Sequence, residues 1–268
     1  MIDKLLCEHI NKNVLDEDVA VLLSGGVDSI SVAYAAAELK KNIHCYSFCL
    51  DINENYDYIK AKQISEKMNW KFTGVVIDTS NLEKDWNRLV ELGCERKTHY
   101  ECVYPFLYVY PKIEETYVLS GWAADGYYGV SKKANIHYKH TKEKFDQFRD
   151  NYFLPENTAG YNMHKKVADL YNKKFITPYL DAKVKEYFYS MDWYELNEPY
   201  QKHHVRNAFD IDQDVKKHLN LQLESGIDTL FESLLNNDRI NFKKRKRIMD
   251  VCRDWKTPPT TNLENFFN

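Results

Sequence analysis

The stretch VAVLLSGGVDSISVAYAAAEL, residues 19–39, joins an apolar segment to a run rich in small residues through two adjacent glycines. Residues 19–23 are all apolar, which is typical of a strand buried on both faces of a parallel sheet. Residues 29–40 have the composition of a helix that packs closely against its neighbours. Two neighbouring glycines weaken both a strand and a helix, so this turn must serve another purpose.

The alternation of strand and helix patterns continues through the first half of the chain. It predicts strands at 43–50, 71–80 and 116–121, and helices at 55–70, 82–93 and 102–113. Such alternation predicts an α/β fold, a parallel twisted sheet with helices on both faces. After residue 130 the patterns predict helices alone. We therefore expect a core over residues 1–130 and a mostly helical region over 131–268 that packs on the core and completes its site.

The composition is ordinary for a globular protein. The chain has 268 residues, of which 44% are hydrophobic and 29% charged, with a formal net charge of −3. No apolar run approaches the roughly 20 residues that span a bilayer, and the first residues lack the apolar core of a signal peptide. The six cysteines form no CxxC pair. We therefore expect a reduced, cytoplasmic protein without a structural zinc site or a membrane partner.

The turn at residues 24–29 has the features of a phosphate-binding loop. It follows the carboxyl end of a predicted parallel strand and opens a helix, where free N–H groups and the helix dipole attract phosphate. Gly25 and Gly26 let the backbone approach an anion, and Ser24 and Ser29 offer hydroxyl groups. The carboxylate of Asp28 would repel phosphate unless a Mg²⁺ ion lay between them. The turn fits neither the Walker A loop nor the dinucleotide fingerprint.

The segment LLSGGVDS resembles the PP-loop of the ATP pyrophosphatases, which split ATP between the α and β phosphates. The resemblance implies that the loop holds the departing pyrophosphate while AMP passes to the substrate. It also implies an adenine nucleotide α-hydrolase-like fold, with ATP and Mg²⁺ as cofactors. The candidate ATP contacts are Leu22, Ser24, Gly25, Gly26, Val27, Asp28 and Ser29, together with Phe48 at the end of the second predicted strand.

A second segment narrows the resemblance. YVLSGWAADGYYGVSK, residues 117–132, is similar to a motif of the asparagine synthetase domain. In that family Ser120 and Gly121 would contact the adenosine part of ATP, and Asp125 would join Asp28 around Mg²⁺. Because the ends of two neighbouring strands supply these two carboxylates, a shared magnesium site is physically reasonable.

Two further segments resemble the same family. KKFITPYLDAKVKEYF, residues 173–188, is similar to an element in which Pro178, Leu180 and Asp181 match. DVKKHLNLQLESGID, residues 214–228, is similar to a stretch whose lysine stabilises pyrophosphate and the transition state, which implies a catalytic role for Lys217. Lys202 could contact phosphate, but we interpret it as a solvated charge.

Departures from the family motif surround the acceptor side of the expected site. Trp122 stands where an acidic residue is frequent, Ala123 replaces a glycine, and Gly126 replaces a glutamate. We therefore expect ATP activation to persist while the second substrate differs from aspartate. Trp122 would give the pocket an apolar or stacking wall.

The implied function is an AMP-forming ligase that adenylates a carboxylate and transfers it to an amine or ammonia, forming an amide. The chain has no N-terminal nucleophilic cysteine and no glutaminase domain, so we expect free ammonia, another amine or a separate glutaminase subunit as nitrogen source. A base must accept the proton of the amine. Its candidates, which we leave unassigned, are Glu95, His99, Tyr100 and Glu101.

Two alternatives remain open. The enzyme could adenylate a nucleobase, as in tRNA or deazaguanine modification, or the chain could be a degenerate ATP- or AMP-binding module. The basic run FKKRKR, residues 242–247, is the one hint of nucleic acid. We interpret it as a solvated helix or a partner contact, so a nucleic acid partner is not favoured.

Overall fold

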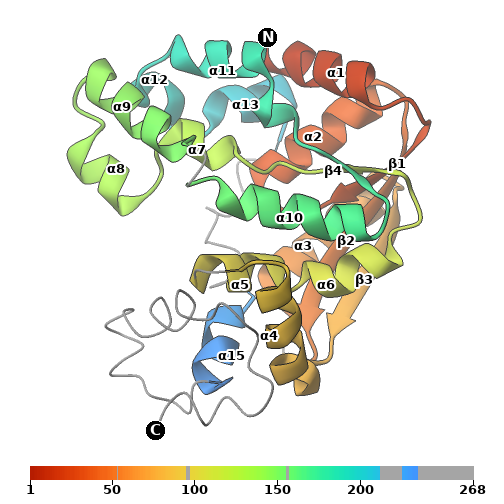
Figure 1. Cartoon of the computed structure of the whole chain (residues 1–268). Helices are drawn as coiled ribbons and strands as arrows, with labels where there is room; N and C mark the ends of the chain where they lie inside the picture. The colour runs from red at the N-terminus through yellow and green to blue at the C-terminus, as the bar shows by residue number, and fades with distance from the viewer. Residues whose placement is uncertain (53, 95–96, 155–156, 212–224, 235–268) are drawn as a thin grey trace, which may run out of the picture.

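A computed structural model describes residues 1–52, 54–94, 97–154, 157–211 and 225–234 (Figure 1). Its centre is a five-stranded, fully parallel sheet with the strand order β3-β2-β1-β4-β5. The strands are β1 (Asp18–Leu22), β2 (Asn42–Leu50), β3 (Lys71–Ile77), β4 (Tyr117–Leu119) and β5 (Lys174–Ile176). The predicted α/β fold with a parallel sheet is therefore confirmed.

Helices surround this sheet. Those of the described residues are α1 (Ile2–Asn13), α2 (Val27–Glu38), α3 (Tyr56–Lys67), α4 (Leu82–Glu91), α5 (Lys97–Val103), α6 (Phe106–Val109), α7 (Ala124–Tyr128), α8 (Lys132–His137), α9 (Lys142–Tyr152), α10 (Ala159–Leu170), α11 (Ala182–Tyr189), α12 (Trp193–Asn197), α13 (His203–Ala208) and α15 (Ile227–Leu234). Short 3-10 turns are η1 (Thr79–Asn81), η2 (Tyr110–Lys112) and η3 (Pro178–Leu180).

The two faces of the sheet have separate cores because side chains alternate along a strand. Val19 and Val21 of β1 pack into one apolar cluster with residues of α1, α2, α7, α11 and α13. Ala20 and Leu22 pack into the other, with residues of α4, α5, α6, α10 and α15. All four are buried, which explains why β1 is apolar without interruption.

The expectation that no strand follows residue 130 is wrong. Strand β5 lies beside β4, with Val118 opposite Phe175, so a segment from the second half of the chain completes the sheet. The boundary near residue 130 remains a prediction, although the sheet crosses it.

The strand order reverses at β1 and β4, which places a crevice outside the carboxyl ends of these two strands. The chain passes from β1 to β2 and β3 on one side of β1, then returns to place β4 and β5 on the other side. In parallel sheets, ligands bind outside the carboxyl ends of the strands at such a reversal. Both predicted motif loops follow the strands that flank this point, one after β1 and one after β4.

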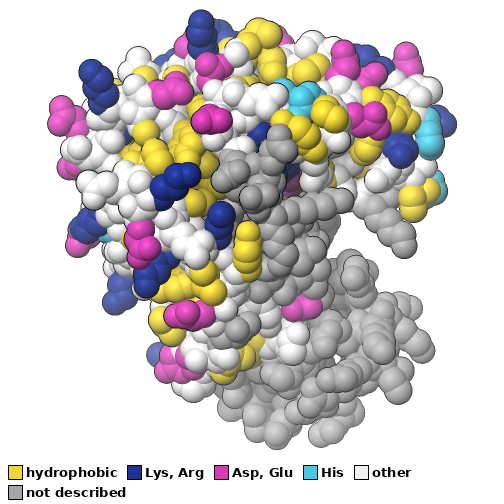
Figure 2. Space-filling view, turned by 180° about the vertical axis from the view of Figure 1, so that it is seen from behind, with side chains coloured by type: hydrophobic (Ala, Val, Ile, Leu, Met, Phe, Trp, Pro, Cys, Tyr) yellow, Lys and Arg dark blue, Asp and Glu magenta, His cyan; other side chains and the backbone are white. Residues whose placement is uncertain are grey.

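The described surface carries mixed charge. On the face in Figure 2, Lys and Arg side chains are interspersed with Asp and Glu side chains over the described residues. None of the helices in the described ranges is long and apolar enough to cross a membrane.

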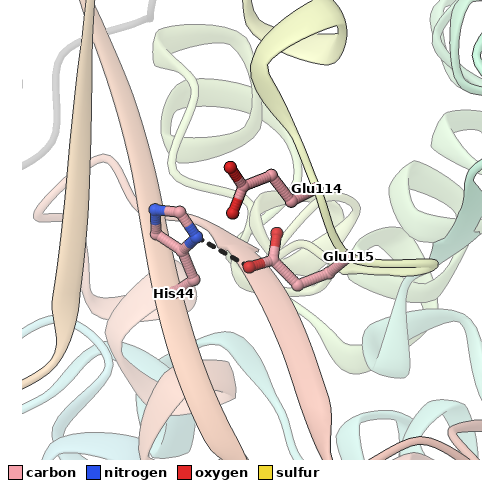
Figure 3. Close-up of side chains that lie close together, drawn as sticks. All are labelled: His44, Glu114 and Glu115. Carbon is pink, nitrogen blue, oxygen red and sulfur yellow. Dashed lines mark hydrogen bonds and ion pairs between the residues drawn. The ribbon is translucent and has the colours of Figure 1, made fainter.

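A buried polar network lies toward the amino ends of the strands (Figure 3). His44 Nδ1 lies 2.6 Å from Glu115 Oε1, and the Tyr46 hydroxyl lies 2.8 Å from the same nitrogen and 2.9 Å from Glu115 Oε2. Among the described residues, His44, Glu114 and Glu115 form the one group of His, Cys, Asp or Glu close enough to hold a metal ion. Because the Tyr46 hydroxyl bridges His44 and Glu115 and Lys71 pairs with Glu114 at 2.9 Å, protein groups already satisfy these ligands. We interpret the network as structural.

Candidate nucleotide-binding site

The loop after β1 holds its shape through its two serines. The backbone N–H of Ser24 donates to Ser29 Oγ at 3.1 Å, and Ser29 Oγ donates to the carbonyl of Gly26 at 3.0 Å. Gly25 has a φ of +71°, and a Cβ there would lie 2.8 Å from the Cβ of Lys60 on α3. Gly25 is therefore required by the turn and by its packing against α3. Gly26 caps α2, and the buried side chain of Val27 enters the core.

The loop after β4 touches the loop after β1 directly. A Cβ on Gly121 would lie 2.5 Å from the backbone carbon of Asp28 and 2.7 Å from the nitrogen of Ser29. Glycine is thus needed here because two backbones meet. Ser120 Oγ accepts a hydrogen bond from the backbone N–H of Trp122 at 3.2 Å, which fixes the turn after the strand.

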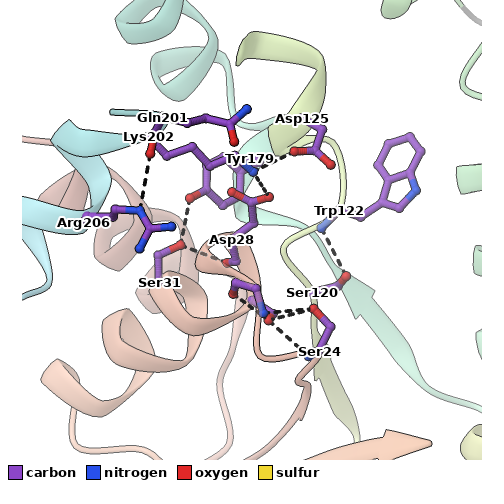
Figure 4. Close-up of polar contacts among 12 residues, drawn as sticks. Ser24, Asp28, Ser31, Ser120, Trp122, Asp125, Tyr179, Gln201, Lys202 and Arg206 are labelled. Carbon is purple, nitrogen blue, oxygen red and sulfur yellow. Dashed lines mark hydrogen bonds and ion pairs between the residues drawn. The ribbon is translucent and has the colours of Figure 1, made fainter. Parts of the chain in front are cut away.

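Lys202 joins the two predicted metal ligands (Figure 4). Its Nζ lies 2.6 Å from Asp28 Oδ2 and 2.6 Å from Asp125 Oδ1. The residue is 4% exposed and sits in the left-handed conformation, with φ 62°, at the start of α13. The interpretation of Lys202 as a solvated charge is therefore wrong. Burial lowers its pKa, but Asp125 and Asp28 outweigh this and raise the pKa above its usual value.

Both carboxylates line one cavity of about 460 Å³. The cavity extends from β2 and α3, across the two loops, to α9 and α10. It thus contains the crevice that the strand order predicts. The predicted contacts that line it are Leu22, Ser24, Gly26, Asp28, Ser29, Phe48, Ser120, Gly121 and Asp125. Their common location is established, while their individual roles stay predictions.

The remaining predicted residues differ in where they lie. Lys217 and Glu95 lie outside the described residues. Tyr100 is buried, stacks on Trp86 and donates to the carbonyl of Cys94 at 2.8 Å, so its hydroxyl is engaged away from the cavity. Glu101 is buried, and His99 lines the cavity.

The element at residues 178–181 contacts the start of α2 through hydrogen bonds, on the side away from the cavity. The Tyr179 hydroxyl lies 2.7 Å from Ser31 Oγ, which donates to the carbonyl of Asp28 at 2.9 Å. Asp181 caps α11 by accepting from the backbone N–H of Lys183 at 2.8 Å. The element therefore positions Asp28 without lining the cavity.

The departures from the family motif have visible consequences. A Cβ on Gly126 would lie 2.4 Å from the ring of Tyr152, so α9 fills the space that a larger side chain would need. Trp122 is half-buried, points away from Lys202 (Figure 4) and packs on Tyr161, with ring centroids 5.1 Å apart. Ala123 adopts the left-handed conformation with φ 78°, in which glycine is favoured.

The acidic pair fits a divalent cation by its chemistry. Two carboxylates from different strand ends already converge on one positive charge, and hard oxygen ligands suit Mg²⁺. The side chains of Asp28 and Asp125 are 16% and 37% exposed, so both can be reached from the cavity. Lys202 Nζ lies between them, and an ion bound there would have to displace it or share the carboxylates with it.

The fold, the glycine loop and the paired carboxylates define an α/β nucleotide-binding protein of the PP-loop class. A family model described as asparagine synthase matches residues 2–175, so the chain belongs to the asparagine synthase family, an ATP-using family of PP-loop enzymes. It matches none of the curated proteins. Among solved structures it is similar to a predicted subunit of tRNA methyltransferase from Methanocaldococcus jannaschii, at 18% identity and a TM-score of 0.35, over 65% of this chain and 75% of that one.

Proposed function

We propose that the protein is an AMP-forming ligase that adenylates a carboxylate and joins it to an amine or ammonia as an amide. The observation that carries the proposal is the meeting of Asp28 and Asp125 at Lys202, in the cavity that also contains the serine and glycine loop. Together these groups gather positive charge and N–H donors beside two potential metal ligands, which suits a bound pyrophosphate.

The chemistry would run in two steps. In the first, an oxygen of the carboxylate forms a bond to the α-phosphorus of ATP, and the bond from that phosphorus to the bridging oxygen breaks, which releases pyrophosphate. In the second, the nitrogen attacks the acyl carbon, AMP leaves, and the nitrogen loses a proton. Such chemistry depends mainly on positioning and charge stabilisation.

The proposal gives a role to each of the residues that meet at this site. The loop after β1 would hold the pyrophosphate, and Asp28 and Asp125 would hold Mg²⁺, which neutralises the charge of the phosphates. Lys202 would contribute a second positive charge next to the leaving pyrophosphate, because its ammonium already lies at the carboxylates. Lys217 is proposed for the same role from the sequence alone.

The test is a product analysis with an Asp28→Asn variant. The wild-type protein, given ATP, magnesium, ammonia and a panel of carboxylic acids, should form AMP and pyrophosphate, which ion-exchange chromatography separates from ADP and phosphate. Asp28→Asn should slow this reaction at least about a hundredfold, because it removes a charge that the transition state needs. Asp18→Asn is the matched control, since Asp18 is exposed at the start of β1, at the end of this strand that lies away from the loop. Formation of ADP, or an unchanged rate in Asp28→Asn, would refute the proposal.

A further inference from the structure

Lys202 and the two carboxylates that it joins differ in how they border the cavity. Of these three residues, Asp28 and Asp125 line the cavity and Lys202 does not. The lysine extends to the carboxylates from the start of α13, and its Nζ lies between them (Figure 4). The ammonium therefore closes the pair from the protein side, while both aspartates face the space that a ligand would enter.

The oxygens that Lys202 engages are the ones that a metal ion would need. Oδ1 of Asp28 is buried, so a cation that enters from the cavity would have to bind Oδ2, which already lies 2.6 Å from the ammonium. Oδ1 of Asp125 lies 2.6 Å from the same ammonium. A metal ion and Lys202 therefore compete for the place between the two side chains.

The charges around this place do not favour a divalent cation by itself. Arg206 is 8% exposed, its charge acts on Asp28, and its Nε donates at 3.3 Å to the carbonyl of Gln201, directly before Lys202. Asp28, Asp125, Lys202 and Arg206 together carry no net charge. A Mg²⁺ ion that entered alone would bring two positive charges close to a buried ammonium, where repulsion is stronger than in water. The phosphates of ATP carry negative charge that would offset this repulsion.

We propose that Lys202 keeps the carboxylate pair closed to a free divalent cation, and that the site admits the metal only together with the phosphates of the nucleotide. Lys202 then sets the selectivity of the site for the metal–nucleotide complex over the free ion. The phosphates supply the ammonium with other anions, so the carboxylates become available to the metal. This inference rests on the proposed function, in which the cavity binds ATP with Mg²⁺.

The test measures the binding of Mn²⁺, a paramagnetic substitute for Mg²⁺, by electron paramagnetic resonance without nucleotide and without turnover. Lys202→Met should bind Mn²⁺ at least about tenfold more tightly than the wild-type protein, because the variant removes the competing charge. Adding Asp28→Asn to Lys202→Met should abolish the gain, which assigns it to this pair. Lys183→Met removes an exposed lysine that pairs with Glu8 and should match the wild type.

Nucleotide binding provides a second measurement. The probe is α,β-methylene ATP, which is not split between the α and β phosphates. Calorimetry should show that magnesium, compared with EDTA, tightens its binding to the wild-type protein at least about tenfold, because metal and nucleotide strengthen each other's binding. The effect of magnesium should be smaller in Lys202→Met, whose carboxylates take up the metal before the nucleotide arrives.

Equal Mn²⁺ affinity in the wild type and Lys202→Met, or an equal effect of magnesium on nucleotide binding in both, would overturn the inference. If Lys202→Met does not fold, the wild-type protein decides, since nucleotide-free Mn²⁺ binding that Asp28→Asn abolishes would also refute it, and its absence would support it. Failure of the proposed function is a separate result, because a protein that releases no pyrophosphate can still show this pattern of Mn²⁺ binding.

Discussion

The ammonium of Lys202 carries out in this structure the task that a metal ion would otherwise perform, because it neutralises two carboxylates that face each other. Its side chain is 5% exposed, and its Nζ also lies 4.9 Å from the ring centroid of Tyr128. A buried charge is tolerated only when it is paired, and here one cation is shared by two anions. Removing it leaves Asp28 and Asp125 in mutual repulsion.

The substitution Lys202→Met tests this balance. It should reduce the free energy of unfolding by about 2 kcal/mol, less than the ~3–5 kcal/mol of a fully buried pair because Asp125 is 37% exposed. Magnesium chloride should restore part of this stability in Lys202→Met and have a smaller effect on the wild type, because the variant leaves the carboxylates without a cation. Thermal melts with and without magnesium measure both effects.

The control is Lys183→Met, whose exposed ion pair with Glu8 should contribute less than about 1 kcal/mol. A Lys202→Met protein with wild-type stability and no response to magnesium would contradict the charge balance described above.

Sequence reasoning found the carboxylates and missed the lysine for a physical reason. Asp28 and Asp125 each lie in the first turn of a helix, just after a glycine-containing loop that follows a strand, so their local pattern predicts their position. Lys202 lies in YQKHHVR, where nothing local distinguishes a buried lysine from a solvated one. Its burial comes from long-range packing of α13 against α1 and α2, and its left-handed backbone has no marker such as glycine.

At the scale of elements, the site depends on how closely the loops after β1 and β4 approach. Gly121 permits a backbone contact in which a single methyl group would overlap the peptide between Asp28 and Ser29. Because the neighbouring atoms are backbone, relief requires movement of a whole loop. The separation of the two carboxylates is therefore set by this contact.

The variant Gly121→Ala should lower the free energy of unfolding by about 1–3 kcal/mol, as overpacking does. It should also slow pyrophosphate release at least about tenfold, since the loops can no longer present both carboxylates to one cation. Urea denaturation and the product assay measure the two effects. Gly160→Ala provides the comparison, because a Cβ there meets nothing within 4 Å, and it should not reduce stability. Equal behaviour of the two variants would count against a close-contact role for Gly121.

The first four strands were predictable from the sequence, and the fifth was not. Strand β1 follows a continuous apolar run and β2 a nearly continuous one. Strand β3 is more mixed, with Lys71, Thr73 and Gly74, and the prediction extended it only a few residues too far. Strand β5 has three residues, of which only Phe175 is buried. Strand β4 is equally short, but all three of its residues are apolar and buried, whereas β5 has no such run and takes its strand conformation from pairing with β4.

On the scale of the whole molecule, the site joins parts that are far apart in sequence. The loop after β1, the loop after β4, α9, α10 and the start of α13 all converge at the carboxyl edge of the sheet. The second half of the chain thus supplies the lysine and the residues of α9 and α10 that line the cavity. The sequence patterns indicated that this half would complete the site, but they could not indicate which of its residues would do so.

The buried histidines of this half make the stability of the whole protein sensitive to acid. Burial lowers the pKa of His164 to about 3, and burial together with His203 lowers that of His204 to about 4. The unfolded chain takes up these protons as the pH falls below about 6.5, whereas the folded protein does not, so the free energy of unfolding must fall. For His164 this loss should approach about 1.4 kcal/mol per pH unit between pH 6 and pH 4. His164→Phe removes this contribution and should therefore show a shallower decline, while His140→Phe, altered at an exposed position, should follow the wild type. Urea denaturation across this pH range measures how steeply the free energy of unfolding falls in each protein. The carboxylates contribute equally to all three proteins and therefore cancel in the comparison. Parallel curves for the wild type and His164→Phe would mean that His164 is not held neutral in the folded state.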